Sequence, residues 1–95
     1  MTHIVLFKFL QNDNKEILIK ILNETYIKLR DEFNVIEDYS FKANILDNSD
    51  NMDFILFVNL RNKEDLSAYI NHPVHKEFLQ KFKEYGLCGK SVIDV

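Results

Sequence analysis

The chain has 95 residues, of which 46% are hydrophobic and 28% charged, a composition typical of one globular domain. Its formal net charge of −3 argues against a nucleic-acid-binding module, because such a module needs a basic face. Cys88 is the only cysteine, so no internal disulfide forms and a reducing compartment is permitted. No segment approaches the ~20 apolar residues of a membrane span, and no signal peptide is visible. We therefore expect one cytoplasmic domain over residues 1–95 without membrane contact.

The first half of the chain predicts a strand, a long helix and two further strands. Residues 3–10 alternate between two faces that are both mostly apolar, and His3, Val5, Phe7 and Phe9 share one of them. Asp13 followed by Glu16 fits a capping box at the start of an amphipathic helix that runs to about Phe33. Residues 36–45 and 53–60 then have the apolar alternation of a second and a third strand.

The second half predicts a broken helix and a last strand. Asn62 is a candidate cap for a short helix that includes Leu66, Tyr69 and Ile70. Pro73 disfavours a helical conformation at His72, but it suits the first position of a new helix. Gly86 is a plausible stop for that helix, and residues 87–95 close the chain with a strand.

The predicted order is β-α-β-β-α-β, which is the ferredoxin-like α+β plan with a broken second helix. Two helices then cover one face of a four-stranded antiparallel sheet. Whichever face they cover, the open face keeps apolar residues: Ile4 and Leu6, or Val5 and Phe7. An apolar sheet face of that size is typical of an interface, so we expect two sheets to pack face to face in a homodimer.

Two segments resemble a known family. The opening strand His3-Ile4-Val5-Leu6-Phe7-Lys8-Phe9 and the pattern Leu66-x-x-Tyr69-x-x-His72-Pro73-x-His75-x-x-Phe78 are similar to the signatures of the stress-responsive A/B barrel (Dabb) domains. The ending Val92-Ile93-Asp94-Val95 is similar to their last strand. The resemblance implies a dimeric α+β barrel, which agrees with the apolar open face. The family includes plant stress-induced proteins, bacterial proteins of undefined role and a few plant polyketide cyclases, so the fold alone does not settle the function.

The resemblance to the cyclases also implies candidate catalytic residues. Their general base, assisting tyrosine and first-strand pocket histidine match His75, Tyr69 and His3. A further pocket histidine of the cyclases falls at Phe54, where this chain departs from their pattern. Most non-enzymatic-looking relatives keep the other positions, so those residues identify the family better than the activity.

The chemistry of these residues leaves two interpretations open. An imidazole with an unperturbed pKa of ~6.5 suits proton abstraction next to a carbonyl, and Tyr69 could hydrogen-bond the enolate that results. Alternatively, His75 and Tyr69 bond each other or the backbone and stabilise the helix break. His72 is expected to be a helix cap or an exposed residue. We expect no metal, because a His-x-x-His pair interrupted by proline is not the helical pair of zinc enzymes, and no nucleotide cofactor, because no glycine-rich loop is present.

Three functions remain as hypotheses. The first is a homodimer that binds a small apolar or aromatic ligand in a cleft between helices and sheet, with Val5, Phe7, Phe54, His72 and Phe78 as binding residues. The second is a cyclase, isomerase or lyase in which His75 is the general base, Tyr69 stabilises the enolate and His3 orients. The third is a structural module that forms higher oligomers. The sequence does not decide whether the protein is an enzyme.

Overall fold

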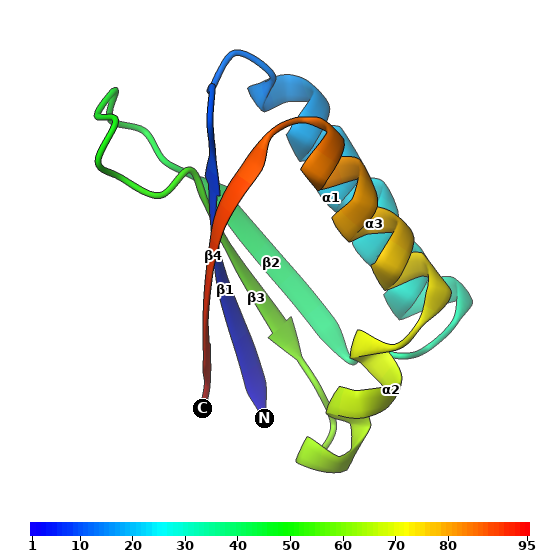
Figure 1. Ribbon diagram of the computed structural model, residues 1–95. Coiled ribbons are helices and arrows are strands. Elements are labelled where there is room, and N and C mark those ends of the chain that lie inside the picture. The colour runs from blue at the N-terminus through cyan, green and yellow to red at the C-terminus, as the bar shows by residue number, and fades with distance from the viewer.

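The computed structural model describes all residues 1–95 and has a four-stranded antiparallel sheet with helices on one face (Figure 1). The sheet order is β2-β3-β1-β4, formed by β1 (Thr2–Phe9), β2 (Asp38–Ala43), β3 (Phe54–Asn59) and β4 (Leu87–Asp94). The helices are α1 (Lys15–Ile27), continued by η1 (Lys28–Glu32), then η2 (Lys63–Asp65), α2 (Leu66–Ile70) and α3 (Pro73–Glu84). The predicted ferredoxin-like order with a broken second helix is confirmed.

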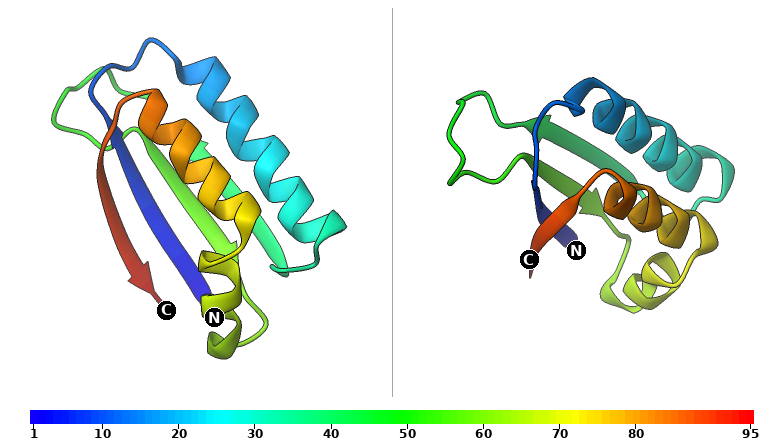
Figure 2. Two further views of the ribbon diagram at one scale, coloured as in Figure 1. Left: turned by 45° about the vertical axis from the view of Figure 1, so that its right-hand side comes forward. Right: turned by 45° about the horizontal axis from the view of Figure 1, so that its top comes forward.

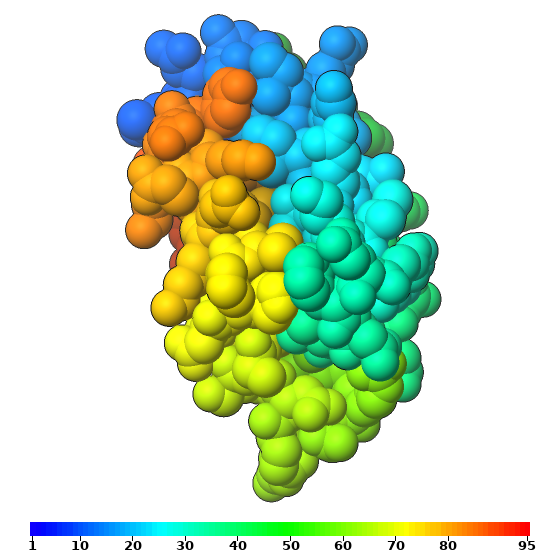
Figure 3. All heavy atoms as spheres, turned by 90° about the vertical axis from the view of Figure 1, so that its right-hand side faces the viewer, coloured from blue at the N-terminus to red at the C-terminus, as the bar shows by residue number.

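The helices form a single layer on one side of the sheet. Helices α1 and α3 lie side by side along the sheet, and the short α2 lies at one end of that layer, set at an angle to α3 (Figure 2). Seen from the helix side, the atoms of α1 and α3 meet along most of their length (Figure 3). None of the helices has both the length and the apolar character that crossing a membrane requires.

The alternation of side chains along β1 determines which sheet face holds the core. Val5, Phe7 and Phe9 point toward the helices and are buried, as are Leu56 and Val58 of the neighbouring β3. Such burial removes large apolar side chains from water, which is the main favourable contribution to folding. The hydrophobic core has fifteen buried residues, which include Leu18, Leu22 and Tyr26 of α1 and Phe78 and Phe82 of α3.

The other sheet face is apolar and has no helices over it. Ile4 pairs with Phe57 of β3 on one side and with Ile93 of β4 on the other, and Leu6 pairs with Ile55. The side chains at these paired positions point to the same side, so the five residues form one continuous patch across three strands. We call Ile4, Leu6, Ile55, Phe57 and Ile93 the open face. Of the two sequence alternatives, Ile4 and Leu6 are therefore the pair that stays uncovered.

The first helix differs from the prediction at both ends. It begins at Lys15 after Asn14, and no side-chain capping bond is present, so the predicted capping box of Asp13 and Glu16 is wrong. At its other end the helix continues as the π-helical segment η1, whose longer turn changes the helical phase. Leu29 within this segment is buried, whereas Phe33 just after it, predicted as the end of the amphipathic helix, is 44% exposed.

Gly86 turns the chain from α3 into β4, as its position at the end of the helical pattern predicts. Its φ of 91° lies in the left-handed region, which glycine adopts without a steric penalty. The Gly86 amide donates to the Lys83 carbonyl at 3.0 Å, and the Gly86 carbonyl accepts from the Leu10 amide at 2.9 Å. The turn therefore closes α3 and places the start of β4 beside the end of β1.

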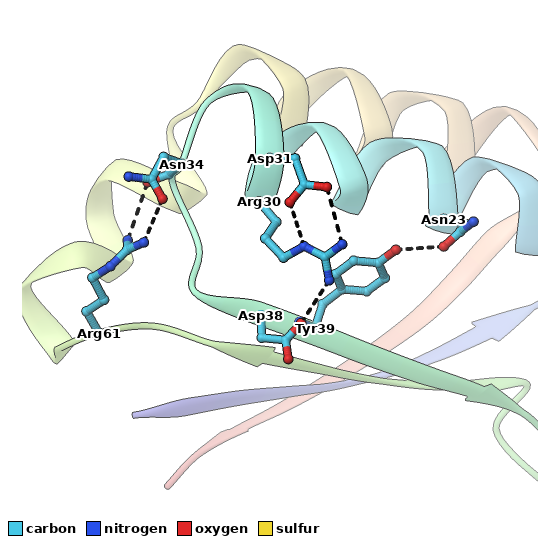
Figure 4. A network of polar contacts seen from close by, with 7 residues as sticks. All are labelled: Asn23, Arg30, Asp31, Asn34, Asp38, Tyr39 and Arg61. Carbon is cyan, nitrogen blue, oxygen red and sulfur yellow. Dashed lines mark hydrogen bonds and ion pairs between the residues drawn. The ribbon is translucent and has the colours of Figure 1, made fainter.

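A polar network joins the first helical segment to the β2 edge of the sheet (Figure 4). Arg30 pairs with Asp31 and with Asp38, and its guanidinium lies 5.3 Å from the centre of the Tyr39 ring, whose hydroxyl donates to Asn23. Hydrogen bonds from Arg30 lower the pKa of Asp31. The pKa of Asp38 is lowered most by a hydrogen bond from the Tyr39 amide, and next by one from Arg30. These groups are at the surface, where ion pairs add little stability.

Candidate functional site

A cavity of about 300 Å³ lies between the sheet and the broken second helix. One wall is formed by β1 and β4 and the other by α2, α3 and one residue of α1. Its apolar lining includes Val5, Phe7 and Leu79. Its polar lining consists of His3, Lys90 and Asp94 from the sheet and Tyr26, Tyr69 and His75 from the helices. The structure thus brings together the three residues predicted as catalytic: His75, Tyr69 and His3.

His75 stands in the first turn of α3 with its side chain in the cavity wall and is 7% exposed. Its Nδ1 lies 3.0 Å from the carbonyl oxygen of Ile70 across the helix break. A carbonyl only accepts, so Nδ1 carries the proton and Nε2 of the neutral ring is an acceptor. Burial lowers the pKa of His75 more than the Ile70 hydrogen bond raises it, and the nearby charge of Lys90 lowers it further.

Tyr69 and Tyr26 share a buried hydroxyl–hydroxyl hydrogen bond of 2.5 Å. Tyr69 comes from α2 and Tyr26 from α1, and both side chains are essentially buried. Burial raises the pKa of both phenols, so both keep their protons at neutral pH. The centres of the Tyr69 and His75 rings are 4.6 Å apart, but the Tyr69 hydroxyl is bonded to Tyr26 of α1.

His3 is paired with a carboxylate that the sequence analysis did not anticipate. Its Nδ1 lies 2.5 Å from Oδ1 of Asp94, the residue directly opposite it on β4. The carboxylate accepts a hydrogen bond from Nδ1–H and holds the imidazole in one orientation. The His3 ring also lies 5.8 Å from the Tyr69 ring. A residue predicted to orient others is therefore itself oriented by Asp94.

Of the five predicted ligand-binding residues, Val5 and Phe7 line this cavity and the other three do not. Phe54 lines a second cavity of about 260 Å³ near the start of α1, because it begins β3 and β3 starts beside the end of β1. Phe78 points into the core and packs edge-to-face on Phe7. His72 accepts a hydrogen bond from the Val74 amide and so caps α3, one of the two roles expected for it.

Three polar lining residues were not among the predicted site residues: Tyr26, Lys90 and Asp94. A tyrosine within a buried helical stripe is a usable signal, because a buried hydroxyl needs a partner. For Lys90 and Asp94 no local signal exists, because their place depends on the register between the first and last strands.

The polar groups of the cavity combine a proton acceptor with hydrogen-bond donors. The acceptor is Nε2 of His75, and the donors are the Lys90 ammonium and the one phenol O–H that the Tyr26–Tyr69 bond leaves unused. Carboxylate and imidazole ligands for a metal are not clustered, since no group of three or more His, Cys, Asp or Glu side chains lies close enough to hold an ion. Such a cavity can bind a small molecule with a polar substituent, and it contains the groups for proton transfer.

Comparisons with known proteins place this geometry in context. The model of the stress responsive A/B barrel domain family (Dabb) matches residues 1–93. A dimeric protein of unknown function with a ferredoxin-like fold from Bacteroides fragilis has a TM-score of 0.82 and 22% identity, and the match covers 99% of this chain and 92% of that one. A dimeric ferredoxin-like protein of unknown function from Thermobifida fusca has a TM-score of 0.76 and 23% identity, covering 97% and 85%.

The same fold also occurs in an enzyme. The hydroxynitrile lyase from Passiflora edulis has a TM-score of 0.67 and 14% identity, with 98% of this chain and 92% of that chain covered. At these identities the likeness shows the fold alone. No curated protein matches the sequence significantly.

The tyrosine pair generates a prediction for stability. Tyr26→Phe or Tyr69→Phe leaves one buried hydroxyl without its partner, so we expect each single variant to lose about 1–3 kcal/mol of unfolding free energy. The double variant leaves no orphan and should lose less than the sum of the two. Urea unfolding of all four proteins measures this coupling. Additive losses would show that the two hydroxyls do not depend on each other.

Proposed function

The chain belongs to the stress-responsive A/B barrel domain family, and from this premise we propose that the protein is a homodimer that binds a small apolar or aromatic ligand between its helices and its sheet. The observation that carries the proposal is the cavity itself. Its volume of about 300 Å³ lies at the lower end of the range for small-molecule sites. Its walls are apolar, with a few convergent polar groups, which is the usual composition of such sites.

The homodimer is supported by the open face. Ile4, Leu6, Ile55, Phe57 and Ile93 form a continuous apolar patch on the side of the sheet that carries no helix. The similar proteins from Bacteroides fragilis and Thermobifida fusca are described as dimeric. The loop between β2 and β3 projects beyond the sheet on the side away from the helices (Figure 1), and there Ile45 is 91% exposed. A second copy on the open face would cover the patch and lie beside this loop.

The cellular location that we propose is the cytoplasm. Cys88 is exposed and unpaired, which suits a compartment that keeps thiols reduced.

Proton-transfer catalysis is a second candidate function, because one observation favours it. The hydrogen bond from Nδ1 of His75 to the Ile70 carbonyl leaves the lone pair of Nε2 free to accept a proton, and the lowered pKa keeps the ring neutral at neutral pH. These are the requirements for a general base. The Passiflora edulis hydroxynitrile lyase supports the idea that this fold accommodates lyase chemistry. Under this proposal His75 removes a proton next to a carbonyl, Tyr69 with its partner Tyr26 stabilises the enolate, and His3 orients the substrate.

The dimer is tested by placing a charge on the open face. Phe57→Asp should convert the dimer to a monomer, or to a misfolded protein, because a buried unpaired carboxylate is costly at a sheet–sheet interface. Sedimentation velocity measures the mass, and circular dichroism reports whether the variant folds. Ile17→Asp is the matched control, since Ile17 is 45% exposed on α1 and distant from the open face. A monomeric wild-type protein would contradict the proposal.

Ligand binding is tested with 2-naphthol as a neutral aromatic probe. We expect the probe to shift the NMR methyl signals of Val5 and Leu79, which line the cavity from β1 and from α3. Leu79→Trp should fill the space and abolish the shifts, whereas Leu10→Trp, at a 77% exposed position outside the cavity, should leave them unchanged. Shifts that persist in Leu79→Trp would place the probe elsewhere.

The catalytic candidate predicts proton exchange in a ketone probe. We expect the protein to accelerate deuterium uptake by phenylacetone in heavy water, followed by NMR. His75→Gln should lose a factor of ~10²–10⁴, the usual contribution of a general base. Because the pKa of His75 is lowered and the neutral ring is the active form, the wild-type rate should still be constant at pH 6.5, the ordinary pKa of an imidazole, and should decline only at lower pH. Equal rates in wild type and His75→Gln would exclude His75 as the base.

A further inference from the structure

Lys90 supplies the only side-chain ammonium in the lining of the cavity. It lies opposite Phe7 in the β1–β4 register, so its side chain is on the helix-covered side of the sheet. Lys90 forms no ion pair with any carboxylate of the chain. An exposed lysine beside an apolar cavity with no acidic partner is a positive charge available to a ligand.

The one carboxylate of the cavity does not neutralise this charge. Asp94 lies four residues further along β4, about 13 Å away at the usual rise of a strand, and its Oδ1 is occupied by His3. The cavity therefore has a positive end at Lys90 and a carboxylate–imidazole pair at the other end. The field of Lys90 also reaches His75, since it is one of the charges that lower the pKa of that histidine.

The other polar groups of the cavity offer an anion no unpaired positive charge, since His3 is paired with Asp94. His75 uses its Nδ1 proton to bond Ile70 and presents a lone pair, which repels a carboxylate. The hydroxyls of Tyr26 and Tyr69 bond each other, so the pair keeps one neutral O–H as a donor and carries no charge. Lys90 is thus the cavity group with an unpaired positive charge, and its flexible side chain can offer a carboxylate a charge-assisted hydrogen bond.

We propose that the cavity selects a small aromatic or apolar carboxylate, with the Lys90 ammonium as the anchor for the carboxylate group. This inference rests on the proposed function, since it names the chemical class of ligand for the same cavity. The aromatic or apolar part lies against Val5, Phe7 and Leu79, and the carboxylate points toward β4. Lys90 is then a specificity-determining residue.

The test compares two probes of the same shape, 3-phenylpropionate and its neutral amide, by calorimetry at low salt. We expect the wild-type protein to bind the acid roughly tenfold more tightly than the amide. Lys90→Met keeps most of the length of the side chain and should remove this preference, mainly by weakening the binding of the acid. Lys90→Arg should keep it. Lys83→Met is the matched control, because Lys83 is exposed on α3 outside the cavity and its loss changes the net charge equally.

The outcomes separate this inference from the proposed function. The role of Lys90 would be overturned if the wild-type protein bound both probes equally, or if Lys90→Met kept the preference for the acid. In either case, the cavity would still be upheld as the binding site if Leu79→Trp blocked binding. Failure of both probes to bind would overturn the role of Lys90 and weaken the ligand-binding proposal together. Loss of the preference at high salt in the wild type, with no salt effect in Lys90→Met, would support the ion pair.

Discussion

The structure of the site depends on one constraint, the proline at position 73. Because Pro73 has no amide proton, a single helix cannot run from α2 through α3, and the chain is extended at His72 instead. His72 caps the new helix, and His75 bonds back across the break to Ile70. The short α2 and the longer α3 therefore lie at an angle, and Tyr69 and His75, from opposite sides of the break, line the same cavity.

The His75–Ile70 bond combines the two roles that the sequence left open. It stabilises the break, as a structural histidine would, and it also fixes which nitrogen of His75 remains an acceptor. Burial then keeps that ring neutral by lowering its pKa, while it keeps the phenols of Tyr26 and Tyr69 protonated by raising theirs. One physical cause, the low polarity between helices and sheet, thus sets the protonation state of the groups on the helical side.

The two faces of the sheet have different uses because strand side chains alternate. In β1, Val5 and Phe7 contribute to the core and to the cavity wall, while Ile4 and Leu6 belong to the open face. One layer of helices covers only one face of a strand that is apolar on both faces, so the other apolar face stays exposed. The same strand therefore links the cavity to the surface on which a second copy is proposed to pack, and the cavity wall is continuous with that surface through the backbone of β1.

Much of the fold follows from local patterns, which is why it was predictable. The alternation in residues 3–10 predicts a strand with two apolar faces, and Pro73 and Gly86 mark where α3 begins and ends. The missing capping box of α1 was not predictable in this way, because an exposed helix end can be capped by side chains or by water. The π-helical end of α1 was not predictable either, because a change of helical phase depends on what the helix packs against.

The sequence by itself therefore determined the order of the elements, the break in the second helix and the candidates His3, Tyr69 and His75. The tertiary structure decided which sheet face is covered and which residues join those candidates. His3 and Asp94 are 91 residues apart, and only the pairing of β1 with β4 brings them into contact. Lys90 reaches the cavity through the same pairing. Register between distant strands depends on the packing of the whole domain, and no local pattern encodes it.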